Sequence, residues 1–131
     1  MKIHLGCGGN RFAGWVNCDL SDSEKDLDLR NPLPFEDNSV DLAYSEHVHE
    51  HLTLEEGNSL LLEVLRVLKP GGIFRIAMPD LDYVVDKYNN NWRDQHWIQH
   101  LGYGHLRTRC EMLNMSMRAW EHKFLYTGEH I

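Results

Sequence analysis

The chain has 131 residues, with 13 basic and 20 acidic side chains and a formal net charge of −7 at pH 7. This length predicts one domain, and the acidic balance argues against nucleic acid as a partner, because that binding depends on clustered Lys and Arg. Three cysteines without C-x-x-C spacing predict a cytoplasmic protein, and neither a signal-peptide pattern nor a membrane-spanning apolar run is present.

Four short apolar runs in the first third of the sequence predict β-strands, because polar residues or glycines bound each run. They cover residues 2–5, 15–19, 26–29 and 40–44. Between the third and fourth runs, Pro32 and Pro34 exclude regular structure.

A helix is predicted to follow these strands. Thr53 and Glu56 match a capping box, and the apolar positions after it recur at helical spacing, namely Leu60, Leu61, Val64, Leu65 and Leu68. Residues 69–72 end this helix, and residues 73–78 predict a fifth strand. Strands that alternate with helices favour an α/β fold with an open, mainly parallel, Rossmann-like sheet and flanking helices.

The remaining sequence predicts helices only. They are expected over residues 83–88 and 92–101, and a second capping box at Thr108 and Glu111 predicts a further helix. No strand pattern follows residue 78, so the sheet is expected to end with the fifth strand.

The stretch SEHVHEHL, from Ser45 to Leu52, holds three histidines and two glutamates. His47, Glu50 and His51 fit the H-x-x-E-H string of zinc peptidases, in which two histidines one helical turn apart bind the metal beside a glutamate base. That site needs a third ligand and a long helix, and the sequence identifies neither, so we expect no metal. The other interpretation is a helix start whose histidines bond locally or face a substrate.

Polar residues stand at the ends of several predicted strands, and in a parallel sheet these ends meet at one edge. Gly6 and Gly8 let the backbone turn tightly and approach a ligand. Asp19 ends the second strand, where its carboxylate can accept hydrogen bonds from two ribose hydroxyls. Asp28 ends the third strand and Ser45 opens the loop after the fourth. Together these residues predict a nucleoside site.

Four stretches in this order resemble motifs of the class I S-adenosylmethionine-dependent methyltransferases, in particular the methyltransferase type 11 group. They are residues 2–10, 16–20, 33–41 and 65–72. The resemblance implies strand order 3-2-1-4-5 and S-adenosyl-L-methionine as cofactor. The glycine loop would line the methionine moiety, and Asp28 with the Leu29 amide would flank the adenine. Asp26 is the alternative to Asp28 for this contact. The implied cofactor-binding residues are Gly6, Cys7, Gly8, Asp19, Leu20, Asp28, Leu29 and Ser45.

The sequence departs from the family pattern in several places. His4 stands where an acidic residue is usual, Asn10 stands where a third glycine often sits, and only 10 positions separate Gly9 from Asp19. We therefore expect the first helix to be very short or missing. The family usually continues into two further strands, which this chain is expected to lack.

The resemblance predicts methyl transfer to an unidentified small-molecule acceptor by a single domain over residues 1–131. Residues 1–91 would form the cofactor-binding core, and residues 92–131 a helical tail and candidate substrate lid. His47, then Glu50, is the candidate base, needed only for a hydroxyl or protonated amine. The alternatives are a non-catalytic cofactor-binding or assembly module and a metal hydrolase. An exposed sheet edge also predicts a homodimer.

Overall fold

The structure, a computed structural model, describes residues 1–130, and Ile131 at the end of the predicted tail lies outside them. The chain divides into two compact units, one formed by Met1–Met78 and one that begins at Pro79. Each unit has its own cluster of buried apolar side chains. The division comes earlier than the predicted boundary at residue 91, because the first helix after the sheet packs into the second cluster through Val84.

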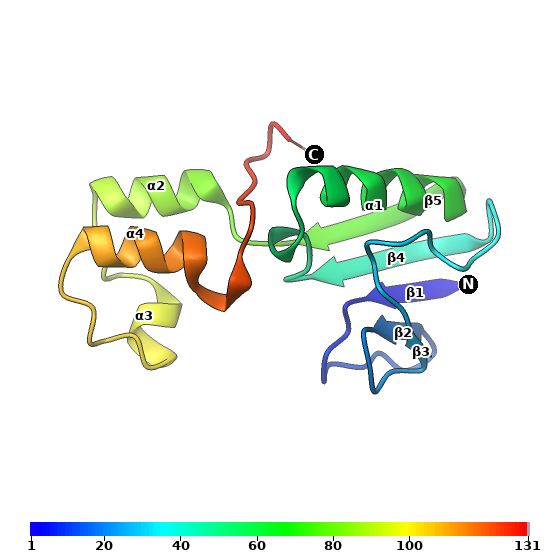
Figure 1. Ribbon diagram of the computed structural model, residues 1–131, viewed down its shortest axis with the longest axis horizontal. Coiled ribbons are helices and arrows are strands. Elements are labelled where there is room, and N and C mark those ends of the chain that lie inside the picture. The colour runs from blue at the N-terminus through cyan, green and yellow to red at the C-terminus, as the bar shows by residue number, and fades with distance from the viewer. Residues whose placement is uncertain (131) are drawn as a thin grey trace. The chain divides into compact units, whose positions relative to one another are not determined.

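The first unit contains a five-stranded parallel sheet of order β3-β2-β1-β4-β5, which confirms the predicted topology (Figure 1). Its strands are β1 (Lys2–Leu5), β2 (Val16–Asp19), β3 (Lys25–Asp26), β4 (Val40–Glu46) and β5 (Leu68–Ala77). Strand order reverses at β1, whose neighbours are β2 and β4. Open α/β sheets bind ligands at the carboxyl ends of the strands beside such a switch point.

Three strand boundaries differ from the prediction. The third strand is shorter and lies earlier, because only Lys25 and Asp26 pair with β2. The fourth strand is longer, since pairing with β5 continues to Glu46, and Ser45 therefore lies inside the strand instead of in a loop. The fifth strand begins directly at Leu68, but residues 69–72 form an irregularity between its first pair and the regular pairing that resumes at Ile73.

The helix α1 (Leu54–Val67) begins where the sequence predicts. The Thr53 hydroxyl accepts from the Glu56 amide at 3.2 Å, and the Thr53 amide donates to the Glu56 carboxylate at 2.8 Å, so the capping box is complete. The predicted apolar stripe is wrong at Leu65, which is 70% exposed. The buried stripe consists of Gly57, Leu60, Val64 and Val67.

Helix α1 covers one face of the sheet, where it packs on residues such as Ile3 and Ala43. On the opposite face, the first unit has no helix within its described residues. Instead Phe12, from the loop between β1 and β2, stacks on His4 with ring centroids 4.3 Å apart. The predicted absence of a first helix is therefore confirmed, and the loop covers part of a face that parallel sheets normally bury under helices.

Asn17 of β2 fixes this loop. Its side-chain amide donates to the carbonyl oxygens of Phe12 and Trp15 at 3.1 and 3.2 Å and to Glu24 Oε1 at 3.1 Å. Its Oδ1 atom accepts from the Phe12 amide at 2.9 Å. A buried side chain with four hydrogen bonds thus holds the chain in place of a helix.

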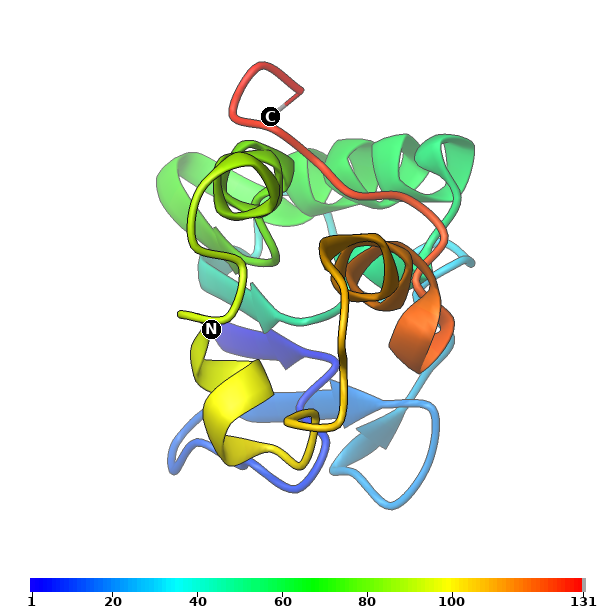
Figure 2. The same ribbon diagram turned by 90° about the vertical axis from the view of Figure 1, so that its left-hand side faces the viewer.

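The second unit is helical. It contains α2 (Leu81–Asn89), α3 (His96–His100), α4 (Arg109–Arg118) and a 3-10 turn η2 (Ala119–Glu121). Helix α2 packs against α4 (Figure 2). The second capping box is confirmed at Thr108, whereas the helix predicted over residues 92–101 is reduced to α3, because residues 92–93 form a turn and residues 94–95 are irregular. No helix in residues 1–130 has the length and apolar character to cross a bilayer.

Candidate functional site

The loop after β1 is shaped by its glycines. Gly6 has φ +67°, and a Cβ atom there would lie 2.3 Å from Val48 Cγ2, so only glycine fits. Gly8 has φ +50° and open space on its Cβ side. Between them, the Cys7 amide donates to the Cys18 carbonyl at 3.0 Å, and burial raises the pKa of the Cys7 thiol. The backbone, not the cysteine, is the exposed part of this loop.

Asp19 at the end of β2 lies against the glycine loop. Its Oδ2 atom accepts from the Gly8 amide at 2.6 Å, and its Oδ1 atom accepts from the Leu20 amide at 2.7 Å. A carboxylate has about four lone-pair sites, so each oxygen can accept a further hydrogen bond. Leu20 is 68% exposed and adds an apolar surface beside the carboxylate. The structure therefore brings together Gly8, Asp19 and Leu20.

The predicted adenine residues lie beyond β3. The Asp28 carboxylate binds the Arg30 guanidinium in a forked pair with N–O distances from 2.6 to 3.0 Å, and this pair raises the pKa of Arg30. Asp26, its competitor, accepts from the Ser23 amide at 3.1 Å and the Ser23 hydroxyl at 3.0 Å. Leu29 is half-buried against the first apolar cluster. Contact of Asp28 and Leu29 with a cofactor stays a prediction.

Ser45 pairs with Leu5 in the sheet register and is 1% exposed. Its hydroxyl oxygen has no hydrogen-bond partner among residues 1–130. It lies one residue before the end of β4, and its contact with the cofactor stays a prediction.

Two catalytic candidates meet in the loop after β4. The His47 side chain is 65% exposed, and its Nδ1 atom lies 2.8 Å from Oε1 of Glu50, which is fully buried. The backbone of His47 has φ +54°, and its amide donates to the Ala77 carbonyl at 3.0 Å. His49 is also buried, and loss of solvation lowers its pKa. This loop places an exposed imidazole on a buried carboxylate.

The backbone of this loop differs from the helix that the H-x-x-E-H string requires. His51 belongs to the 3-10 turn η1 (His49–His51), and His47 precedes that turn with a left-handed backbone conformation. The two histidines therefore do not stand on successive turns of a long helix, which the peptidase pattern requires.

Sequence reasoning missed two residues near this edge. Asn17, which fixes the first loop, is a polar residue inside a short apolar run, and that contrast was the available signal. Glu46 ends β4 and accepts from the Tyr44 hydroxyl at 3.0 Å. The sequence places the end of this strand at Tyr44, so Glu46 fell outside the predicted strand end.

Comparison with known proteins matches residues 19–76 to the methyltransferase domain family. The PH0226 protein from Pyrococcus horikoshii OT3 is 28% identical, with a TM-score of 0.52 over 66% of this chain and 49% of that one. The partner of the Trm112 methyltransferase activator in a Haloferax volcanii complex is 24% identical, with a TM-score of 0.50 over 71% of this chain and 50% of that one. The chain thus spans about half the length of both, and no curated protein matches it.

Proposed function

We propose that this chain is a class I S-adenosylmethionine-dependent methyltransferase that transfers a methyl group from S-adenosylmethionine to a small-molecule acceptor, which its sheet topology and the match of residues 19–76 to a methyltransferase domain support. The contact between the Gly8 amide and the Asp19 carboxylate at 2.6 Å carries the proposal most directly. Gly8 lies in the loop after β1 and Asp19 ends β2, so the two groups meet at the sheet edge where strand order reverses. That edge is the usual ligand site of open α/β sheets.

The residues at this edge fit the cofactor. The open space beside Gly8 admits a ligand close to the backbone, and the carboxylate of Asp19 retains acceptor sites for the two ribose hydroxyls. The exposed Leu20 side chain supplies apolar surface next to them. When bound, S-adenosylmethionine supplies a methyl group on a positively charged sulfur, which is a strong leaving group. The chain must then hold an acceptor in line with that methyl group.

His47 is suited to remove a proton from the acceptor. Its Nδ1 atom bonds to the Glu50 carboxylate, which favours the tautomer that leaves Nε2 free to accept a proton. Because the ring is exposed, an acceptor hydroxyl or amine can reach Nε2. The buried charge of Glu50 would stabilise the imidazolium that forms, so Glu50 acts as a positioning residue and His47 as the base.

Cofactor binding is tested by calorimetry and thermal unfolding with S-adenosylhomocysteine. A ligand that binds only the folded state adds about 2.7 kcal/mol at one hundred times its dissociation constant, which moves the melting temperature by several degrees. We expect this stabilisation, and little effect from zinc followed by a chelator. Stoichiometric zinc together with no response to S-adenosylhomocysteine would overturn the proposal.

Catalysis is tested separately with labelled S-adenosylmethionine and a panel of small hydroxyl and amine compounds. Methyl transfer that is lost in His47→Asn supports an enzyme. Cofactor binding without transfer to any acceptor supports the non-catalytic module instead, for which the relevant observation is that residues 1–78 place no helix on the face of the sheet opposite α1.

We also propose that the chain forms a homodimer through the β5 edge. Strand β5 pairs only with β4 among the described residues, and Ile73 on the face opposite α1 is 61% exposed. Unpaired strand edges are templates for pairing with another chain. Light scattering should find a dimer that Ile73→Lys weakens, while Leu62→Lys on the exposed side of α1 leaves it intact. A strict monomer at all concentrations would contradict this proposal.

A further inference from the structure

Helix α3 (Figure 1) carries two exposed histidines, His96 and His100. They stand four positions apart, which places two side chains next to each other on the surface of an α-helix. Their rings are in contact, with centroids 4.7 Å apart and ring planes inclined by 47°. The same spacing joins His47 and His51, but those residues do not share a helix. The helical histidine pair that the H-x-x-E-H string requires therefore occurs in the second unit.

Packing in the second unit fixes the orientation of α3. Ile98 is 3% exposed and belongs to the second apolar cluster. Gln95, just before the helix, is also buried: its Nε2 atom donates to the Trp92 carbonyl at 2.8 Å, and its Oε1 atom accepts from Trp97 Nε1 at 3.1 Å. Because these side chains turn inward, the two histidines face solvent on a backbone whose position the core determines.

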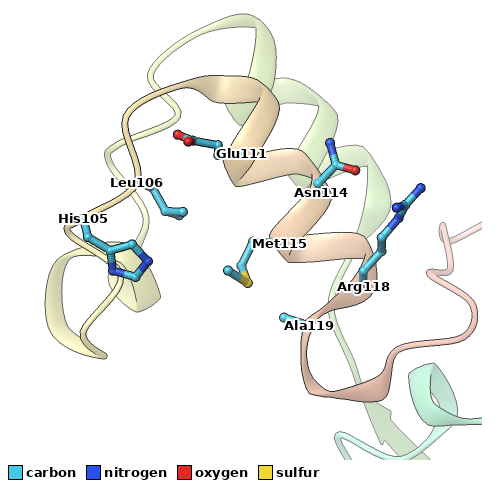
Figure 3. Close-up of a pocket in the computed structure, with 7 residues that line it drawn as sticks. All are labelled: His105, Leu106, Glu111, Asn114, Met115, Arg118 and Ala119. Carbon is cyan, nitrogen blue, oxygen red and sulfur yellow. The ribbon is translucent and has the colours of Figure 1, made fainter.

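Neither ring of the α3 pair has a hydrogen-bond or ion-pair partner within residues 1–130. Other exposed histidines differ in this respect. His105, which lines a shallow hollow beside α4 (Figure 3), has its Nδ1 atom 3.1 Å from the Gly102 carbonyl oxygen, and Nδ1 of His130 lies 3.3 Å from the Thr127 hydroxyl. A neutral imidazole with a free acceptor nitrogen is the commonest metal ligand in proteins. The α3 pair offers two of them side by side.

We propose that His96 and His100 together bind one divalent transition-metal ion, with preference for Cu²⁺ and Ni²⁺. An ion about 2.1 Å from each nitrogen needs the two nitrogens about 3 Å apart, which exposed rings already in contact reach by side-chain rotation. Among residues 1–130, no third His, Cys, Asp or Glu joins them within 4.8 Å. Structural zinc sites use four protein ligands, whereas tetragonal Cu²⁺ and Ni²⁺ accept nitrogen ligands together with water.

Binding of the ion should stabilise α3 itself. The amides of Ile98 and Gln99 donate to the Gln95 carbonyl at 3.0 and 3.1 Å. The Leu101 amide donates to the Trp97 carbonyl at 3.1 Å. Helices as short as this one are marginal by themselves, so an ion that joins the first and last residues of α3 should slow the opening of these bonds. With only two ligands from the chain the ion exchanges, so stoichiometric zinc is not expected in the isolated protein.

The probe is Ni²⁺, titrated by calorimetry into the full chain without an added histidine tag. His96→Asn and His100→Asn should each weaken the tightest Ni²⁺ site by about tenfold or more, because loss even of a group that only orients a ligand costs 10–100-fold in metal affinity. His105→Asn is the matched control, since it removes an exposed histidine of the same unit that is not in the pair. His51→Asn is the second control and tests the H-x-x-E-H string. Both controls should bind Ni²⁺ as the unaltered chain does.

Amide hydrogen exchange locates the ion. Ni²⁺ should slow exchange at Ile98, Gln99 and Leu101 in the unaltered chain, and this protection should vanish in His100→Asn. Equal Ni²⁺ affinity in the unaltered chain and both α3 variants would overturn the site, as would loss of binding in His51→Asn alone or no binding at millimolar Ni²⁺. The result is independent of the proposed methyl transfer, because α3 lies in the second unit and Asp19 in the first, and S-adenosylhomocysteine is absent from the titration.

Discussion

The loop after β1 and the loop after β4 leave the sheet from neighbouring strands, yet they are built from different groups. The first presents backbone, since Gly8 and Gly9 are exposed and the one carboxylate beside them comes from β2. The second is built from side chains, since Glu50 is fully buried and supports the exposed ring of His47. The loops touch where Gly6 passes Val48.

Under the proposed function, this difference separates cofactor binding from proton transfer. A loop that presents amides suits the sugar and the amino acid parts of a nucleoside cofactor and needs no particular side chain except small ones. A loop that buries a carboxylate beneath an imidazole is suited to proton transfer, and its function depends on that one pair of side chains. Substitutions in the two loops should therefore change different measured quantities.

The largest effect is expected for Gly6→Ala. The added Cβ would overlap Val48 Cγ2 and would also have to adopt φ +67°, so we expect a loss of about 3 kcal/mol of unfolding free energy, measured by urea denaturation. Gly8→Ala is the control, because it has a positive φ but no atom within 4 Å, and should cost about 1 kcal/mol. Val48→Ala should recover part of the loss in Gly6→Ala. Equal losses for both glycine variants would show that the two loops do not meet closely at Gly6.

His47→Asn should reduce the rate of methyl transfer by about a hundredfold or more with a hydroxyl or amine acceptor, because removal of a general base typically costs this much. Affinity for S-adenosylhomocysteine should stay within about twofold, since His47 follows β4 whereas Asp19 ends β2. Glu50→Gln should lower the rate less and change its dependence on pH. If His47→Asn instead weakened cofactor binding and left the rate intact, the division of roles between the loops would be wrong.

Sequence predicted well those features that depend on neighbouring residues. The two capping boxes at Thr53 and Thr108 are local patterns, and both appear in the structure. Strand order was implied by the resemblance of four stretches to motifs of a known family, and the structure confirms it. The position of Ser45 was wrong because the length of β4 depends on its pairing with β5, and the exposure of Leu65 was wrong because helix rotation depends on the sheet beneath. The burial of Glu50 is likewise a tertiary property that its motif does not contain.

Asp19→Ala should weaken the binding of S-adenosylhomocysteine by more than about tenfold. Hydrogen bonds to a charged group contribute about 1.5–3 kcal/mol each, and this carboxylate is placed to accept two of them from the ribose. Glu36→Ala, at an exposed position in the loop before β4, is the control and should bind normally. Calorimetry that finds unchanged affinity in a folded Asp19→Ala protein would remove Asp19 from the site.

The smallest effect concerns the pH dependence of stability. It should arise from the buried His49 in the loop after β4 and not from the exposed glycine loop after β1. Burial lowers the pKa of His49 from its ordinary value of 6.5, although the charge of Glu50 opposes this shift, and His4 is shifted in the same direction. Below pH 6.5 the unfolded chain therefore binds protons that the folded chain does not, so stability is complete above this pH and falls as the pH drops toward the folded pKa.

We expect urea denaturation to show a loss of about 1 kcal/mol for each pH unit below 6.5 over this range. His49→Asn should reduce that slope, whereas His100→Asn, at an exposed position, should keep it. Stability at neutral pH does not enter this comparison, because only the slope reports proton uptake. An unchanged slope in His49→Asn would mean that His4 or the carboxylates dominate the acid response, and that the burial of His49 in the loop after β4 contributes little to it.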